Sequence, residues 1–372
     1  MNLPDKEENM IDERILKSEE RAIFALRSIY RSYGYLPYKM SKFEEYDFYA
    51  QNKDFLVSDS IITFNDTDGA LLALKPDVTL SIIKNSSLEP GMKKRVYYDE
   101  NVYRVSGSTH RYKEIMQSGL ECVGDIDLYD KFEAVYLAAK SLSVISPEFV
   151  IDLSHMGIFS SVIDSACESR SFMRRALALI SEKNLHELTS LCSEYEIDGS
   201  LASVICELAT LYGAPDKVLE RLKDLPLPKS CTDSIFELSE ICALLSKTEF
   251  YDRIRLDFSV LSDMNYYNGI VFSGFLSGIC EGVLSGGEYQ ALMSKLKRRG
   301  SGVGFAIYLD LLSSVSGTED EFDGDVFILY SDKTAADKLY EKKEELVKAG
   351  LRTSSGKAVP SDKKYREIIN LS

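Results

Sequence analysis

The sequence predicts an α+β fold in which an antiparallel sheet is flanked by helices. Two β-rich runs, at 94–105 and 112–123, are separated by a short polar loop and predict an antiparallel hairpin. The long segment 156–247 has helical periodicity almost throughout, with short breaks at Gly, Pro and Ser. Two further runs rich in aromatic and β-branched residues, at 253–260 and 265–275, predict that the sheet resumes after these helices.

The elements before the hairpin follow from periodicity and turn chemistry. A helix is expected over 10–33, because apolar side chains recur every three or four residues and Gly34 provides a stop. A second helix is expected to begin within Phe43–Phe48. Residues 61–74 predict a hairpin with its turn at Asn65–Gly69.

The elements predicted after the hairpin divide the chain into four parts. We expect a helix over 127–144, a strand over 149–153 and a helix over 288–296. The segment 302–315 opens with glycines and is expected to become helical. Beyond 315, the composition predicts a linker, then a strand at Val326–Tyr330, a helix at Thr334–Ala349 and a short strand at 351–353. The parts are therefore a core with its first portion at 1–155, a helical insertion at 156–247, a second core portion at 248–315, and a linker with a short C-terminal α/β segment at 316–372. This last part is too short for a robust independent core.

The second strand of the hairpin has two chemically different faces, because successive side chains of a strand alternate. One face is mostly apolar and suits a core; it carries Met116, Ser118, Leu120 and Cys122. The other face carries Gln117 and Glu121, with Gly119 between them leaving an open floor, and Arg104 supplies a nearby cation. This predicts a cleft for a small molecule with an ammonium and a carboxylate or phosphate. The alternative is the solvated face of a half-buried hairpin.

Asp77 and Thr79 stand where an extended segment gives way to a helix. Pro76 biases Lys75 toward an extended conformation, and a helix is expected from about Asp77. A helix N-terminus is a natural place to meet a charged ligand. The alternative is that the two side chains only cap the helix.

Charge and composition argue against several classes of function. The chain has 372 residues and a net charge of −15, and its densest basic run, Lys295–Arg299, is short. Nucleic-acid binding needs clustered Lys and Arg, so a tRNA partner is disfavoured. The acidic N-terminal residues 1–16 resemble no secretory signal, and no apolar run is long enough to cross a bilayer, so we expect a cytoplasmic protein without a membrane partner.

Cysteine and histidine usage predicts neither disulfides nor a metal site. The seven cysteines are an odd number without a C-x-x-C pair, which indicates reduced thiols. The three histidines, at 110, 155 and 186, lack metal-ligand spacing. No cofactor is implied.

Five motifs in the correct order resemble the catalytic domain of class II histidyl-tRNA synthetases over roughly residues 10–315. They are LKPDVT at 74–79, the arginine and second strand of motif 2 within 98–124, NYYNGIVF at 265–272, SGGEYQAL at 285–292, and the glycine-rich opening of motif 3 at 302–312. The resemblance implies a six-stranded antiparallel sheet flanked by helices, in a protein that is usually dimeric.

The resemblance also implies roles for individual residues. The positions expected to surround a histidine-like ligand are Asp77, Thr79, Gln117, Glu121, Tyr266 and Tyr267. Those expected to contact an anion or phosphate are Arg104 and Arg111. Glu121 can neutralise an ammonium group and Gln117 can hydrogen-bond it.

Departures from the family pattern bear on catalysis. An arginine of the family is Ser262 here with Asp263 beside it, and the Glu-Arg that ends motif 3 is Asp310–Leu311. Adenylate formation needs fixed cations on developing negative charge, and losing one such donor costs about 100–1000-fold in rate. We therefore expect no adenylation. Val78 and Asn265 also differ from the family's glycine and aspartate.

A synthetase-like domain that keeps the amino-acid pocket and loses the ATP chemistry resembles the regulatory subunits of ATP phosphoribosyltransferase. The resemblance implies a non-catalytic subunit, a homodimer within a hetero-oligomer, that activates a short-form catalytic subunit and contributes to histidine feedback inhibition in the first step of histidine biosynthesis. The alternatives are a diverged but active histidyl-tRNA synthetase and an amino-acid-sensing paralogue with another partner. A pocket kept only as folding scaffold is a third possibility for the site.

Overall fold

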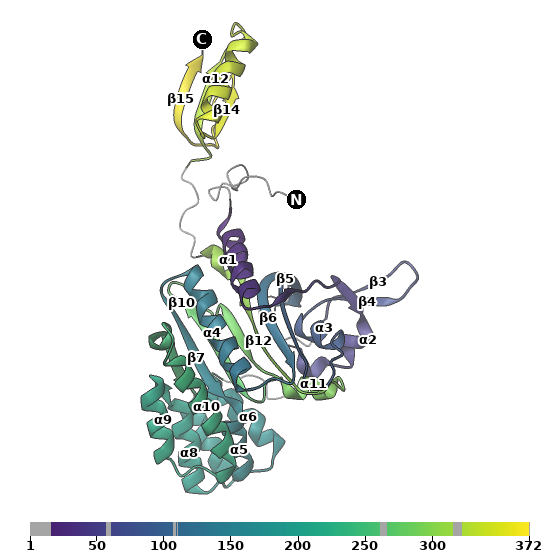
Figure 1. Cartoon of the computed structure of the whole chain (residues 1–372), viewed down its shortest axis with the longest axis vertical. Coiled ribbons are helices and arrows are strands. Elements are labelled where there is room, and N and C mark those ends of the chain that lie inside the picture. The colour runs from purple at the N-terminus through teal and green to yellow at the C-terminus, as the bar shows by residue number, and fades with distance from the viewer. Residues whose placement is uncertain are drawn as a thin grey trace. The chain divides into compact units, whose positions relative to one another are not determined.

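The chain forms two compact units, residues 1–315 and 316–372, in the computed structural model (Figure 1). The structure describes residues 16–56, 61–106, 109, 111–260, 266–314 and 322–371. In this part of the chain, no helix is both long and apolar enough to cross a membrane.

A nine-stranded sheet organises the first unit. In spatial order its strands are β1 (Leu36–Pro37), β5 (Lys93–Val105), β6 (Tyr112–Gly124), β12 (Ser301–Tyr308), β11 (Leu284–Glu288), β10 (Ile270–Leu276), β7 (Phe149–His155), β9 (Ile254–Asp257) and β8 (Tyr212–Gly213). The six strands from β5 to β7 in this order are antiparallel to their neighbours. Toward the margins of the sheet, β1 pairs in parallel with β5, and β9 pairs in parallel with β7. The predicted α+β fold with an antiparallel sheet is confirmed.

The predicted hairpin is the longest strand pair of this sheet. β5 and β6 pair from Lys93 opposite Gly124 to Val105 opposite Tyr112. Leu120 and Cys122 face the main apolar core, as their alternation predicts. Of the loop between the strands, residues 107, 108 and 110 lie outside the described residues.

Two helices cover the core face of the sheet. They are α1 (Ser18–Ser32) and α4 (Leu128–Ile145), and Figure 1 shows α4 lying over the strands. Tyr30 of α1 is fully buried against Tyr97 and Phe305, which join the helix to the sheet. Residues 10–15 of the predicted helix 10–33 lie outside the described residues, and residues 16 and 17 precede α1 without helical structure. The helix α1 ends at the expected place.

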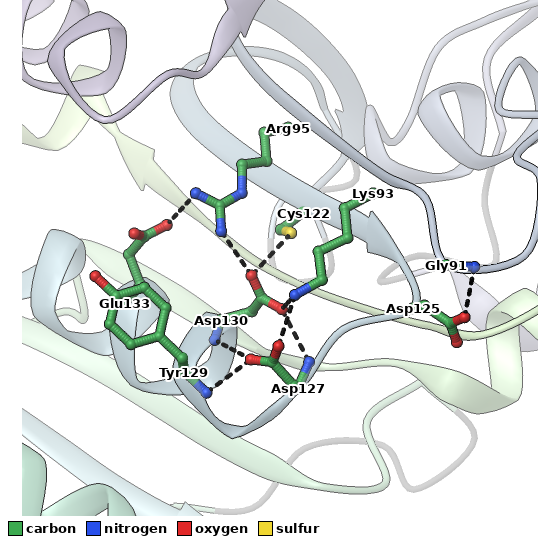
Figure 2. Close-up of polar contacts among 9 residues, drawn as sticks. All are labelled: Gly91, Lys93, Arg95, Cys122, Asp125, Asp127, Tyr129, Asp130 and Glu133. Atoms are coloured by element: carbon green, nitrogen blue, oxygen red, sulfur yellow. Dashed lines mark hydrogen bonds and ion pairs between the residues drawn. The ribbon is translucent and has the colours of Figure 1, made fainter.

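A buried polar cluster fixes the start of α4 against the start of the hairpin. Asp130 is fully buried and pairs with Arg95, 2.7 Å away, and with Lys93, 2.5 Å away (Figure 2). Arg95 also reaches Glu133 at 3.0 Å, and Asp127 caps the helix. This cluster sets the position of the strands that carry the candidate site.

A smaller set of elements lies over the other face of the hairpin. The strands of a three-stranded antiparallel sheet are β2 (Phe43–Glu45), β4 (Leu71–Leu74) and β3 (Thr63–Asn65), in spatial order. The helices are α2 (Tyr46–Ala50), the 3₁₀ turn η2 (Lys53–Phe55), α3 (Thr79–Lys84) and α11 (Gln290–Lys295). The predicted hairpin at 61–74 is confirmed by the pairing of β3 with β4. The helix expected to begin within Phe43–Phe48 begins at Tyr46, and residues 43–45 before it pair with β4 as a strand.

Six helices lie between β7 and β9 along the chain. They are α5 (Met156–Ala166), α6 (Arg170–Ser181), α7 (Leu185–Glu194), α8 (Gly199–Thr210), α9 (Pro215–Asp224) and α10 (Thr232–Leu245), with 3₁₀ turns η3 (Lys229–Cys231) and η4 (Tyr251–Arg253). Buried residues of these helices and of the sheet belong to one continuous apolar cluster. The helices therefore stabilise the sheet as part of the first unit.

The segment 302–315, which was expected to become helical after its opening glycines, is a strand over the first half of its length. Residues 301–308 form the strand β12, between β6 and β11, and a 3₁₀ turn, η5 (Leu309–Ser314), follows. Val303, Phe305 and Ile307 are buried on one face and glycines 302 and 304 on the other. A strand buried on both faces lacks the alternation of exposed polar residues that distinguishes it from a helix.

The second unit is a small parallel sheet with one helix. Its strands are β13 (Gly324–Tyr330), β14 (Thr353–Gly356) and β15 (Tyr365–Leu371), with β13 in the centre, and its helix is α12 (Ala336–Lys348). Val326, Ile328 and Leu346 form its buried cluster. The strand β15 was not predicted, and the strand predicted at 351–353 begins only at Thr353.

Candidate functional site

A cavity of about 340 Å³ lies on the face of the hairpin that carries Gln117 and Glu121. Its lining comes from the hairpin, from α3 and Asp77 before it, from the neighbouring strands β11 and β12, and from the segments at 55–56 and 266–267. The complete lining is Phe55, Leu56, Asp77, Thr79, Tyr98, Arg104, Gln117, Glu121, Tyr266, Tyr267, Ser285, Gly304, Phe305, Ala306 and Tyr308.

Seven of the eight residues predicted from the sequence line this one cavity. They are Asp77, Thr79, Arg104, Gln117, Glu121, Tyr266 and Tyr267. Arg111 does not line it and lies exposed at the end of the hairpin loop, where its carbonyl accepts a hydrogen bond from the Ser106 N–H. Segments almost 200 residues apart in the chain are thus brought together.

Glu121 is the most enclosed acid of the site. It is 2% exposed, and its Oε1 accepts a hydrogen bond of 2.6 Å from the Thr79 hydroxyl. Its Oε2 accepts a hydrogen bond from the buried Tyr289 hydroxyl. Burial raises the pKa of Glu121 from 4.5 to about 8, because removing a carboxylate from water disfavours its charged form. The two hydroxyl donors and the burial thus act in opposite directions on this pKa.

Asp77 both caps α3 and lines the cavity. Its Oδ1 accepts a hydrogen bond of 2.8 Å from the Leu80 N–H in the first turn. Burial raises the pKa of Asp77, while the Leu80 bond and the charge of Arg104 oppose this rise. The capping role and a ligand-facing position, which were alternatives in the sequence, coexist here.

Arg104 is held as a fixed cation beside Asp77. Its Nε donates a hydrogen bond of 3.1 Å to the Pro76 carbonyl, which leaves the rest of the guanidinium available to the cavity. Among the described residues of the lining, Arg104 is the one with a positive charge. The cavity therefore offers two buried carboxyl groups, an amide and one guanidinium.

Aromatic side chains form the walls. The rings of Tyr266 and Tyr267 meet edge to face with their centroids 4.6 Å apart, and the ring centroids of Tyr266 and Tyr289 are 6.1 Å apart. Burial raises the pKa of Tyr266 and Tyr267 well above the ordinary value, so both hydroxyls stay neutral and can donate hydrogen bonds.

The floor beneath the cavity differs from the open floor expected at Gly119. Tyr98 pairs with Gly119 across the hairpin, and a Cβ added at Gly119 would lie 2.6 Å from the Tyr98 hydroxyl. The Tyr98 ring therefore occupies the space that the glycine leaves. Ala306 pairs with Gly119 on the next strand, and Ser285 pairs with Ala306 on the strand after it. Their small side chains leave the rest of the cavity floor open.

Several residues of the site were not found from the sequence. Tyr98 and Tyr308 join the lining, and Tyr289 orients Glu121 from behind it. Gly304 is needed because a Cβ there would lie 1.9 Å from Glu121 Oε2. The G-G-x-Y segment and the glycines of 302–304 were seen as motifs, but only the strand register shows which side chains they face.

Only some of the residues that depart from the family pattern belong to the part of the chain that the structure describes. Ser262, Asp263 and Asn265 lie outside the described residues. Leu311, in the place of an arginine of motif 3, packs against the main apolar core and does not line the cavity. Val78 is 1% exposed and packs with Ile82 and Tyr98, so its side chain points away from the cavity lining.

The chain is similar to curated proteins named ATP phosphoribosyltransferase regulatory subunit. It is 28% identical to that of Oceanobacillus iheyensis over 301 residues, which cover 80% of this chain and 73% of the relative. It is 26% identical to that of Clostridium kluyveri over 336 residues, which cover 88% of this chain and 86% of the relative.

Solved structures with the same fold carry related names. A structure described as an ATP phosphoribosyltransferase regulatory subunit/histidyl-tRNA synthetase from Bacillus halodurans matches with a TM-score of 0.78 and 20% identity, covering 100% of this chain and 99% of that one. A chain of the ATP phosphoribosyl transferase (HisG:HisZ) complex from Thermotoga maritima matches with a TM-score of 0.61 and 22% identity, covering 81% of this chain and 98% of that one. The sequence model of the family described as histidyl-tRNA synthetase matches residues 11–312, and the chain therefore belongs to the histidyl-tRNA synthetase family.

Proposed function

We propose that this chain is a non-catalytic regulatory subunit of ATP phosphoribosyltransferase, which activates a short-form catalytic subunit and contributes to histidine feedback inhibition. The observation that carries the proposal is the composition of the cavity. It gathers Asp77, Gln117 and Glu121 for an ammonium and an imidazole, yet Arg104 is its one cation among the described lining residues. This set suits a free amino acid better than an ATP triphosphate, which needs several fixed cations. The names of the relatives support the same role.

The ligand proposed for the cavity is histidine. A free histidine carries an ammonium, a carboxylate and a polar ring, and the cavity holds carboxyl groups, a guanidinium and tyrosine hydroxyls to match them. Titration calorimetry tests this: Glu121→Ala should weaken histidine binding by at least tenfold. Glu114→Ala, on the exposed end of the same strand, is the matched control and should bind like the wild type. Equal affinity of wild type and Glu121→Ala would remove histidine from the proposal.

Reconstitution tests the regulatory role itself. The purified chain is mixed with a short-form catalytic subunit, and formation of phosphoribosyl-ATP from ATP and phosphoribosyl pyrophosphate is followed with and without histidine. We expect a complex, a higher rate than that of the catalytic subunit alone, and inhibition by histidine that Glu121→Ala relieves. Neither complex formation nor stimulation would overturn the assignment.

A diverged histidyl-tRNA synthetase is the enzyme alternative, favoured by the family match itself. Histidine-dependent exchange between ATP and pyrophosphate separates the two. We expect no exchange, because Leu311 packs in the core where motif 3 of a synthetase provides an arginine. Robust exchange would establish the synthetase.

An amino-acid sensor for another partner is a further alternative, and it predicts histidine binding without stimulation of the catalytic subunit. We further propose that the chain works in the cytoplasm, as a homodimer within the hetero-oligomer.

A further inference from the structure

The small three-stranded sheet of β2, β4 and β3 has one face that points away from the core. Side chains alternate between the two faces of a strand. In the central strand β4, Ala73 points into the first unit and is fully buried, so Leu72 and Leu74 point the other way. Residues that pair with these two leucines lie on the same face as they do. This outer face is therefore made of Phe43, Glu45, Phe64, Leu72 and Leu74.

The outer face is apolar and open to solvent. Phe43 and Phe64 are 46% and 38% exposed, and their rings meet edge to face with their centroids 5.6 Å apart. Leu72 and Leu74 are partly buried, yet neither packs against any of the buried clusters formed by the described residues. Exposed apolar residues that gather on one face and are rimmed by charged residues mark an interaction site.

The charged residues around the outer face are separated by sign. The turn between β3 and β4 projects from the first unit (Figure 1) and carries Asp66 and Asp68, and Glu45 lies toward the same end of the sheet. Lys39 and Lys42 come just before β2, and because β2 runs antiparallel to β4 they lie at the opposite end. All five residues are exposed, and none forms an ion pair with another described residue.

An apolar face with acidic residues at one end and basic residues at the other is complementary to itself. A two-fold axis through the face sets the acidic end of one copy against the basic end of the other, and the apolar residues of the two copies against each other. We propose that the outer face binds the same face of a second copy of this chain. Phe43 and Phe64 pack between the copies, and Lys42 pairs with the acidic turn of the other copy. The inference rests on the homodimer proposed above and names its surface.

The size of the outer face sets the strength of the contact. The strands β2, β4 and β3 contribute only three, four and three residues to the sheet. A standard stable interface buries about 800 Å² on each partner and involves about 20–30 residues a side. Association through the outer face is therefore weak and reversible, and we expect the dimer to dissociate on dilution.

Analytical ultracentrifugation of the full chain over a range of concentrations measures this association. Phe64→Glu places a charge within the apolar contact and should weaken association about tenfold or more. Phe236→Glu is the matched control, because Phe236 is 65% exposed on α10 and lies outside the outer face, so this variant should associate like the wild type. Circular dichroism and urea unfolding establish that each variant is folded.

Charge reversal tests the two-fold arrangement without changing the apolar packing. Lys42→Asp and Asp68→Lys each bring like charges together at both ends of the contact, so each should weaken association about threefold. The double variant restores opposite charges between the copies and should recover the association of the wild type. Because the two positions lie at opposite ends of one sheet, this recovery needs a contact between two copies. Unchanged association in both single variants, or no recovery in the double variant, would overturn the arrangement.

The same measurements separate this surface from the proposals on which it rests. If the wild type self-associates and folded Phe64→Glu associates equally well, the homodimer stands and the outer face is the wrong surface. If the wild type is monomeric at every concentration, the homodimer and this surface both fail, while the regulatory role is still decided by reconstitution. If the chain alone is monomeric and Phe64→Glu abolishes its complex with the catalytic subunit, the outer face binds that subunit and the proposal of a second copy is overturned.

Discussion

Glu121 is deeply buried and lies next to two hydroxyl donors, so its protonation state depends on what occupies the cavity. Both carboxyl oxygens accept hydrogen bonds, from Thr79 and Tyr289, yet burial still raises the pKa to about 8. At neutral pH the free protein therefore holds Glu121 largely protonated. A cationic group that enters the cavity favours the carboxylate and releases the proton.

Replacing Glu121 with Gln should change the pH dependence of stability. The folded-state pKa lies above the unfolded value, so the folded chain holds this proton more tightly, and wild-type stability falls as pH rises from about 4.5 to 8. The slope from this one group is at most about 1.4 kcal/mol per pH unit. Glu121→Gln lacks the titration, so its stability relative to wild type should increase between pH 5 and pH 8. Urea unfolding at several pH values measures this, and parallel stability curves for the two proteins would contradict it.

Adding one methyl group at Gly304 should damage the cavity. The new Cβ would lie 1.9 Å from Glu121 Oε2 and 2.4 Å from the Leu120 carbonyl, and neither the strand nor the hydrogen-bonded carboxylate can move freely. Gly304→Ala should reduce stability by about 1–3 kcal/mol, the range for overpacking, and weaken ligand binding. Gly282→Ala is the control, because its Cβ would meet Phe275 at an ordinary 3.5 Å. If both variants unfold at the same urea concentration, the close approach at Gly304 is wrong.

The residues of the cavity could be predicted only where a motif or an alternating strand marks them. Gln117 and Glu121 follow from the two faces of β6, and Asp77 and Thr79 from a helix start. Tyr98 carries no such mark, since it lines the cavity only because strand register sets it opposite Gly119. Tyr289 reaches Glu121 across 168 positions of sequence, and no local pattern encodes that contact.

The hairpin depends on the element packed against its start. Asp130 of α4 is fully buried and joins the helix to Arg95 and Lys93 of β5 (Figure 2). Asp127 of the same turn is 61% exposed on its side chain. The two carboxylates are three positions apart, which makes them a natural pair for comparison.

Asp130→Asn should destabilise the fold more than Asp127→Asn. The first change leaves two cations beside a buried amide, and we expect a loss of about 3 kcal/mol, the lower end for a broken buried ion pair, because the cations are partly exposed. The second keeps a good helix cap and breaks only a surface ion pair, so we expect a loss below about 1 kcal/mol. Chemical unfolding measures both. A smaller loss for Asp130→Asn than for Asp127→Asn would show that the cluster does not anchor α4.

Elements were predictable where the two faces of a strand meet different surroundings. β6 has the core on one side and the cavity on the other, so its alternation is visible in the sequence. β12 has the core on one side and the side chains of other strands and loops on the other. Its residues 302 and 304 are glycines because the Tyr289 and Glu121 side chains occupy the space where a Cβ would lie. Without polar residues at alternate positions, its run was mistaken for a helix.

At the scale of the whole chain, each unit has its own apolar core. The main cluster extends from α1 through the sheet to the six helices after β7. Val326, Ile328 and Leu346 form the separate cluster of the second unit. The cavity lining comes entirely from residues 55–308, within the first unit. Shortness alone predicted that residues 316–372 would not have a robust core, and the sequence before β15 gave no signal for a third strand.

A chain that ends at residue 315 should therefore keep the fold and the ligand cavity. Its main core and all described lining residues are present, so we expect an unfolding free energy within about 0.5 kcal/mol of that of the full chain, as for changes away from a core. Histidine affinity should also stay within twofold.

A chain that ends at residue 260 is the contrasting variant, because it lacks β10, β11 and β12 and leaves β6 without a partner on one edge. That chain should not fold cooperatively. Residues 316–372 alone should unfold at low denaturant, because a unit of this size buries too little apolar surface to be more than marginally stable. Loss of cooperative unfolding in the chain ending at 315 would mean that the first unit needs the second for its stability.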